Sequence, residues 1–178
     1  MEQNAPDAAA KAAAFANGLR KSISVNGNRW SQWPNGANDL AAIVARIDQI
    51  RADLVAPGAD VAACIADLRS ILEWSTYQSA AVATARALLT ARKTRNFAEQ
   101  FGLMDSGVPA VASLVDAEDS LIENIRTKNA YMEAIAERHP HLVLPQPLVR
   151  PESLAAKIAK KPGRLDLIQQ LMKSKKKK

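Results

Sequence analysis

Aromatic residues are scarce in this chain of 178 residues, where Phe, Trp and Tyr together make up only 4%. Much of the 48% apolar content is alanine, which has the highest helix propensity of all residues. A sheet sandwich relies on aromatic and β-branched side chains, so this composition disfavours one. The length is enough for one domain with a buried core. The composition therefore predicts an all-α protein.

Cysteine and long apolar runs are also rare. Cys64 is the only cysteine, which excludes an intramolecular disulfide and a cysteine-based metal cluster. No run of eighteen apolar residues occurs, so we expect no transmembrane segment. The early acids Glu2 and Asp7 argue against a secretory signal peptide. We therefore expect a soluble protein, cytoplasmic or within an assembled particle.

Sequence signatures of catalysis are missing as well. The chain has no G-x-S-x-G, no H-E-x-x-H and no glycine-rich phosphate loop. His139 and His141 flank Pro140, a spacing that would let two metal ligands point to one side of an extended strand, but no third ligand is near in sequence. Cations that terminate a helix explain the pair more simply. We therefore expect no enzyme, no cofactor and no metal site.

Turn residues and apolar stripes divide the chain into helices. A helix from Pro6 to Asn17 should end at Gly18, and residues 22–37 should form an irregular loop with a small hairpin at Asn26-Gly27. An antiparallel bundle of about four main helices should then fill residues 38–138 as two helical hairpins. We expect these helices at residues 39–55 with Asn38 as N-cap, from Asp60 to before Trp74, at 76–101 and at 109–138.

Two apolar stripes support these helices most clearly. The strictest one steps by three and four through Leu40, Ile43, Ile47, Ile50 and Leu54. The last helix carries Val111, Leu114, Leu121, Ile125, Met132 and Ile135. Both stripes predict faces that are buried in a bundle.

Two of the three tryptophans, Trp30 and Trp33, lie in the loop before the first bundle helix. They could form a platform for bases or for a membrane interface. Because aromatics are so scarce and the loop is flanked by turns, we predict instead that they anchor the loop at the end of the bundle, near Trp74. We expect an indole N–H to bond a loop carbonyl.

The third and fourth helices carry opposite charges. No acid occurs between Glu73 and Glu99, and no base between Arg95 and Arg126. An antiparallel hairpin should therefore bring Arg92 and Arg95 near Asp116 and Asp119, and we expect the charges to neutralise each other. The alternative is a phosphate-binding patch, which would consist of Arg92, Lys93 and Arg95.

The C-terminal arm, residues 139–178, differs from the rest in composition. Its first part, residues 139–151, has four prolines and should be extended; we call it the strap. The strap is too apolar for solvent and must lie on its own bundle or on a neighbouring chain. Short helices should follow, the last one amphipathic. The predicted partner-docking residues are Leu142, Val143, Leu144, Leu148, Val149, Leu165, Ile168, Leu171 and Met172.

Positive charge is concentrated in the arm. The chain carries a net charge of +6, but residues 1–138 have 14 Lys and Arg against 16 Asp and Glu, and the arm has 10 against 2. The predicted contacts with phosphates or an acidic partner are Arg164, Lys173, Lys175, Lys176, Lys177 and Lys178.

These features favour a non-enzymatic structural or assembly protein, a homo-oligomer or part of a larger complex, which docks through its arm. Structural proteins of virus particles and their assembly factors often combine a helical bundle with an apolar strap and a basic tail. The comparison rests only on these shared physical features. The alternative is a sequence-independent DNA- or RNA-binding accessory protein that acts through the lysine tail. No aromatic residues alternate with the lysines, and attachment to a membrane surface ranks behind both hypotheses.

Overall fold

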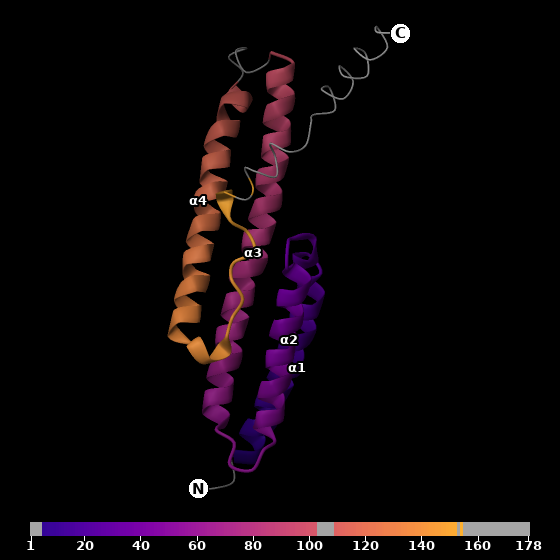
Figure 1. Ribbon diagram of the computed structural model, residues 1–178, viewed down its shortest axis with the longest axis vertical. Helices are drawn as coiled ribbons and strands as arrows, with labels where there is room; N and C mark the ends of the chain where they lie inside the picture. Colours follow the sequence, from indigo (N-terminus) through magenta and orange to yellow (C-terminus); the bar gives the residue numbers. More distant parts are fainter. Residues whose placement is uncertain (1–4, 103–108, 153, 155–178) are drawn as a thin grey trace, which may run out of the picture.

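The computed structural model describes residues 5–102, 109–152 and 154, and this part of the chain is all-α (Figure 1). Its elements are the helices α1 (Ala5–Gly27), α2 (Gly36–Leu54), α3 (Val61–Gln100) and α4 (Pro109–Arg138), and the 3-10 turns η1 (Trp30–Gln32) and η2 (Pro140–Leu142). Helices α1 and α2 form a hairpin beside the first part of α3, and α3 and α4 form a longer hairpin (Figure 1). The predicted antiparallel helical bundle is confirmed.

Helix α1 is longer than its sequence indicated. It continues through Gly18 to Gly27, so the expected stop at Gly18 and the hairpin at Asn26-Gly27 are wrong. The reason is a helical stripe of small and apolar residues that crosses the glycine. Its buried members are Ala12, Ala16, Leu19 and Ile23. Ile23 packs into the core while Val25 stays 64% exposed, and this burial outweighs the local alternation of serine with β-branched residues.

Helix α2 begins at Gly36, two residues before the expected cap at Asn38. Its N-cap is Asn35, which adopts a left-handed conformation with φ of 63°. The backbone of Gly36 packs directly against the carbonyl group of Trp30, so any side chain at this position would collide with that group. The predicted stripe of α2 is confirmed, since Ile43, Ile47 and Ile50 are fully buried.

Helix α3 is a single element of 40 residues, about 60 Å long. It serves both hairpins, and the break expected at Trp74-Ser75 is wrong. Ser75 donates its hydroxyl to the carbonyl of Leu72 within the helix, and the fully buried Trp74 ties this turn to the core. Asp60 is the N-cap of α3, since its carboxylate accepts a hydrogen bond from the amide of Ala63 at 3.0 Å.

Helix α4 has the bounds that its sequence indicated, Pro109 to Arg138. Ile125, Met132 and Ile135 face the core and are at most 1% exposed. The side chains of Val111 and Leu114 lie outside the described residues. Pro109 fits the first turn of a helix because its nitrogen has no proton to leave unbonded, which explains why this boundary is readable from sequence.

The tryptophans anchor the loop between α1 and α2. Trp30 is fully buried and meets Trp74 edge to face, with ring centroids 5.7 Å apart and an angle of 83°. Its indole Nε1–H donates to the hydroxyl of Ser79 at 3.3 Å, whereas a loop carbonyl had been expected. Trp33 is 7% exposed. The loop is thus tied to α3.

A charged cluster joins α1 to α2 and gives a testable pH dependence. Arg20 donates from Nε to both carboxylate oxygens of Asp48 at 2.9 and 3.0 Å, and Arg51 donates to the same carboxylate at 2.8 Å. These hydrogen bonds, first that of Arg20 and then that of Arg51, lower the pKa of Asp48 below its usual 3.8.

A carboxylate with a lowered pKa stabilises the fold above the pKa of the unfolded chain and loses this contribution as the pH falls through its own pKa. The substitution Asp48→Asn should therefore lower the urea midpoint of unfolding at pH 7. The difference from the wild type should shrink as the pH falls below 3.8 and vanish once the pH is below the lowered pKa. Urea titrations of both chains across this range test it. A difference of the same size at both ends would contradict the assignment.

Candidate functional site: the strap and the side chains around it

The strap lies on its own bundle. After η2 it turns back along α3, and its contacts come from α3, from α4 and from the loop before α2 (Figure 1). The core includes the side chains of Leu142, Leu144 and Val149 from the strap, and also Leu154, three residues beyond its end. Residues 143–150 form neither helix nor strand. The extended conformation expected from residue 139 onward is wrong at the start of the strap, where Pro140–Leu142 form a 3-10 turn and Val143 is left-handed.

Two buried amide side chains hold the backbone of the strap from opposite sides. The side-chain carbonyl of Gln78 on α3 accepts from the amide of Leu148 at 3.3 Å. On α4, Asn129 donates from Nδ2 to the carbonyl of Val149 at 2.8 Å. An extended segment has no internal hydrogen bonds, so its buried backbone groups need such partners. Gln78 and Asn129 are buried polar residues whose role is to supply them.

This placement changes the interpretation of the predicted docking residues. Leu142, Leu144 and Val149 pack against their own chain and offer no surface to a partner in this structure, and Leu148 is partly buried. Val143 is 84% exposed, at a left-handed φ of 48°. The other docking residues, and all the basic residues predicted to contact phosphates or an acidic partner, lie outside the described residues. The docking residues concerned are Leu165, Ile168, Leu171 and Met172, and the basic ones are Arg164, Lys173, Lys175, Lys176, Lys177 and Lys178.

The second predicted basic site is engaged in ion pairs. Arg92 Nε and Arg95 Nη1 both contact Oε2 of Glu118 at 3.1 Å, and Arg95 also pairs with Glu99 at 3.0 Å. The expected acceptors were Asp116 and Asp119, which lie on the exposed side of α4, while Glu118 is on the face that packs against α3. Lys93 is exposed. The geometry favours a hairpin that neutralises its own charges over a phosphate-binding patch.

The side chain of Glu118 is only 5% exposed, so its loss should be costly. We expect Glu118→Gln to lower the free energy of unfolding by about 2–3 kcal/mol, less than for a fully buried pair because both guanidinium groups are partly in water. The matched variant Asp119→Asn, at an exposed neighbour, should stay within about 0.5 kcal/mol of the wild type. Equal effects of the two variants in urea unfolding would contradict the buried pair.

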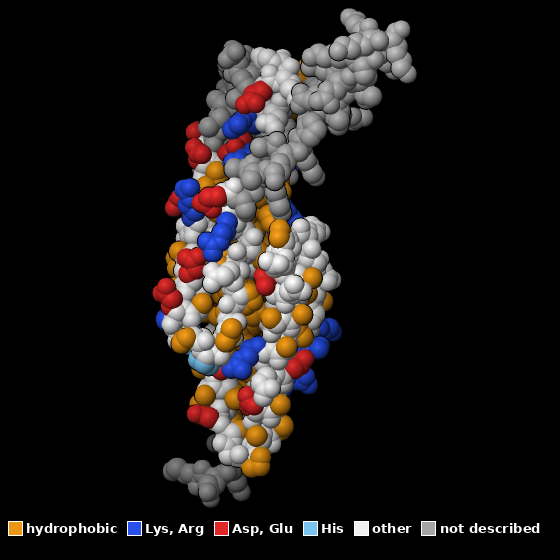
Figure 2. All heavy atoms as spheres, viewed as in Figure 1, with side chains coloured by type: hydrophobic (Ala, Val, Ile, Leu, Met, Phe, Trp, Pro, Cys, Tyr) orange, Lys and Arg blue, Asp and Glu red, His pale blue; other side chains and the backbone are white. Residues whose placement is uncertain are grey.

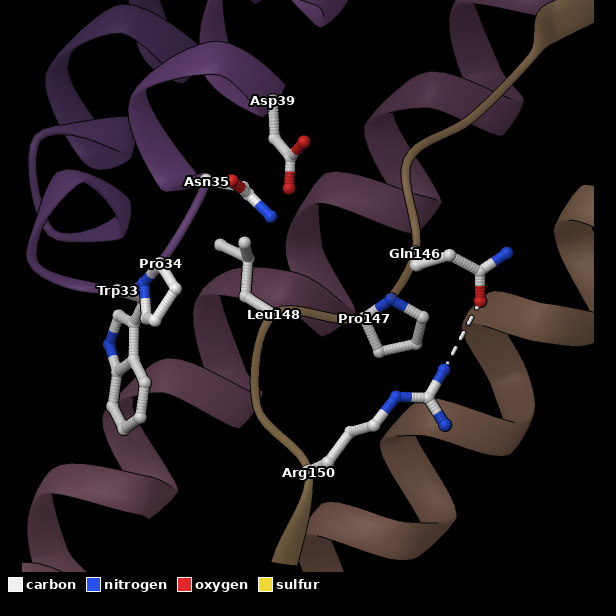
Figure 3. Close-up of a pocket in the computed structure, with 8 residues that line it drawn as sticks. All are labelled: Trp33, Pro34, Asn35, Asp39, Gln146, Pro147, Leu148 and Arg150. Carbon is white, nitrogen blue, oxygen red and sulfur yellow. Dashed lines mark hydrogen bonds between the residues drawn. The ribbon is translucent and has the colours of Figure 1, made fainter. Parts of the chain in front are cut away.

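A cavity of about 460 Å³ lies between the strap and the loop before α2 (Figure 3). Trp33, Pro34 and Asn35 line one side and the strap residues 146–148 the other. Asp39 stands at the α2 side, and burial raises the pKa of its carboxyl. Arg150 stands across from it and donates to Gln146 at 3.2 Å. The cavity combines apolar walls with one group of each charge, and sequence reasoning missed it because its two sides are over a hundred residues apart.

A second cluster forms where the strap leaves α4. Nε2 of His141 lies 2.7 Å from Oδ1 of Asp67 on α3, and Nε2 of His139 lies 3.1 Å from the hydroxyl of Ser70, one turn further along α3. Arg46 on α2 approaches the other oxygen of Asp67 at 3.9 Å. The histidine pair of the sequence is thus joined by an acid that lies over seventy residues away.

Cys64 lies on α3 one turn before Asp67 and is partly buried. Burial, with a smaller effect of the nearby carboxylates Asp53 and Asp67, raises the pKa of its thiol. A raised pKa keeps the sulfur protonated at neutral pH, which disfavours a reactive thiolate.

None of the helices that the structure describes has the length and apolar character needed to cross a bilayer. Comparisons of the chain with models of protein families, with curated proteins and with solved structures found no match.

Proposed function

We propose that this protein is a non-enzymatic structural or assembly subunit whose docking element is the basic segment that follows Leu154. The proposal rests on a contrast in net charge along the chain. Residues 1–154, which include the strap, carry a slight negative charge, and residues 155–178 carry a strong positive charge. Residues 1–154 carry 15 Lys and Arg against 17 Asp and Glu, whereas residues 155–178 carry 9 against 1. The segment therefore holds a net charge of +8, next to a body of −2.

The position of Leu154 supports this division. Its side chain is fully buried, and its amide donates to the carbonyl of Arg150 at 3.2 Å. The chain is thus attached to the bundle as far as Leu154. The basic segment, residues 155–178, begins directly after this anchored residue. Docking through residues 155–178 would leave the core of the bundle intact.

An acidic face on α4 provides a partner surface of complementary charge. Asp116, Asp119 and Glu123 are exposed, and Asp116 and Asp119 make no ion pair with any residue in the described part of the chain. Several acidic side chains are visible along the edge of the molecule where α4 lies (Figure 2). We therefore infer homotypic assembly, in which the basic segment of one copy binds the acidic face of another.

The composition of the segment favours a protein surface over nucleic acid. Its apolar residues recur at helical spacing, at positions 165, 168, 171 and 172, beside the lysines. An amphipathic helix of this kind buries apolar area against a groove, which a phosphate backbone does not offer. A tail that binds phosphates by counterion release needs only the lysines.

Sedimentation equilibrium of the nuclease-treated protein near physiological salt tests the proposal. The full chain should form a dimer or larger species, and a chain of residues 1–154 should be monomeric. The triple variant Asp116→Asn, Asp119→Asn, Glu123→Gln should weaken self-association about tenfold or more, as expected for rim charges acting together. Its matched control removes the same charge from exposed acids elsewhere, with Asp7→Asn, Asp53→Asn and Glu73→Gln, and should assemble normally.

A monomeric full chain, or equal assembly of the full and shortened chains, would contradict homotypic assembly. If the monomer instead bound random-sequence duplex DNA with a steep salt dependence, the nucleic-acid hypothesis would replace it. In that case deletion of residues 174–178 should make the slope of log K against log salt less steep by about 0.9 for each lost phosphate contact.

A further inference from the structure

Three side chains that commonly coordinate metals meet at the corner between α4, α3 and the strap. Asp67, His139 and His141 each offer one ligand atom, and these atoms all lie within 4.8 Å of one another. A tetrahedral ion with bonds of about 2.0 Å needs its ligand atoms about 3.3 Å apart. The largest separation between these ligand atoms therefore exceeds this spacing by no more than about 1.5 Å.

We propose that these three residues form a binding site for a divalent transition-metal ion, with Zn²⁺ as the best match. Two imidazoles and one carboxylate are a known set of protein ligands for zinc, with the fourth position open to water or to a further ligand. The proposal goes beyond the assembly function and does not depend on it.

The backbone holds both histidines in a defined turn. The amide of His139 donates to the carbonyl of Ile135 at the end of α4, and the amide of Leu142 donates back to the carbonyl of His139 at 3.0 Å. Leu142 itself is 2% exposed and fixes the turn in the core. As a result, the two imidazole rings lie together, with centroids 6.0 Å apart. The site is therefore largely formed before an ion binds.

Hydrogen bonding sets the tautomer of His139. The hydroxyl of Ser70 donates to the carbonyl of Ala66 at 3.0 Å, which leaves its oxygen free to accept from Nε2–H of His139 at 3.1 Å and favours that tautomer. The proton on Nε2 leaves the lone pair at Nδ1, where it can bind a metal. Ligating histidines usually have such a partner on their other nitrogen, which orients the ring.

His141 and Asp67 provide the remaining two ligands. Their 2.7 Å contact fits an Nε2–H donor and a carboxylate acceptor. An ion that binds both atoms would take the place of this proton, and the neutral ring would then carry its proton on Nδ1. The side chain of His141 is 54% exposed, so it can make the small movement and the ion can reach it.

The ligand atoms decide which ion the site can bind. Arg46 lies 3.9 Å from the second oxygen of Asp67 and opposes every divalent cation alike. Calcium and magnesium depend on several oxygen ligands, whereas this site offers one carboxylate. Ions that bind strongly to imidazole nitrogen, such as Zn²⁺ and Co²⁺, are favoured.

Isothermal titration of the full, tag-free chain with Zn²⁺ tests the site, with Co²⁺ absorption in the visible region as a second readout. The wild type should bind one ion per chain, and Co²⁺ should give the spectrum of a four- or five-coordinate ion. His139→Ala, His141→Ala and Asp67→Asn should each weaken binding about 100-fold or more, beyond the 10–100-fold typical for the groups that orient metal ligands. Arg46→Gln should tighten it several-fold.

Asp53→Asn is the matched control, at an exposed acid on α2, and should bind like the wild type. Circular dichroism of each variant without metal shows whether the helices are intact, and Asp67→Asn keeps the shape of the side chain if the alanine variants lose helix. Binding by Asp67→Asn and His141→Ala at wild-type affinity would overturn the proposal. The proposal would also be overturned if the wild type bound no Zn²⁺ at an ion concentration of about 0.1 mM. Weak extracellular calcium sites have dissociation constants of this order.

Discussion

A chain that ends at residue 142 is expected to lose most of its free energy of unfolding, whereas a chain that ends at residue 154 should keep it. The difference between them is residues 143–154, which contribute Leu144, Val149 and Leu154 to the core. Burial of each side chain stabilises the fold by about 1.5–3 kcal/mol, roughly 4.5–9 kcal/mol for the three. Domains of this size have a free energy of unfolding of about 5–15 kcal/mol, so this loss removes most of it.

Circular dichroism and urea titration of the two truncated chains measure this directly. A pair of point variants separates burial from chain length, because the strap has two valines in opposite surroundings. Val149 is fully buried and Val143 is 84% exposed. We expect Val149→Ala to lower the free energy of unfolding by about 1–3 kcal/mol and Val143→Ala by less than about 0.5 kcal/mol. A stable, cooperatively unfolding chain that ends at 142 would show that the strap is dispensable.

The second large loss of stability is expected from substitution of Trp30. Trp30→Ala should lower the free energy of unfolding by about 3–5 kcal/mol, because it removes a fully buried indole and leaves Trp74 without its edge-to-face partner. Trp30→Phe keeps a ring but loses the hydrogen bond to Ser79, and should cost less. Urea unfolding monitored by circular dichroism measures both. Unchanged stability of Trp30→Ala would contradict the anchor and revive the platform hypothesis.

Local signals predicted the helices well where burial agreed with them. Pro109 and Arg138 marked the ends of α4, and the isoleucine stripe identified the buried face of α2. The local signals gave wrong helix ends where burial of a helix face continues past a residue that normally ends a helix. Gly18 and the Ser-Val alternation indicated a helix end, but the face of α1 continues to Ile23. Propensity differences of about 1 kcal/mol per residue are easily outweighed by such burial.

The candidate sites also depend on contacts between residues that are far apart in the sequence, which local signals do not reveal. The prolines predicted an extended strap and its apolar residues predicted that it is covered, but the sequence left open whether its own bundle covers it. The answer depends on Gln78 and Asn129, two amides that no motif distinguishes. Likewise, the histidine pair had no third ligand nearby in sequence, because Asp67 reaches it only through the packing of α3 against the end of α4.

The central claim is that the strap belongs to the bundle of its own chain. Hydrogen exchange at the amide of Leu148, which donates to Gln78, tests it most directly in a chain of residues 1–154 at a concentration where sedimentation shows a monomer. We predict strong protection that does not change with protein concentration. Rapid exchange in the monomer, with protection only in an oligomer, would show that the strap is held by a neighbouring chain.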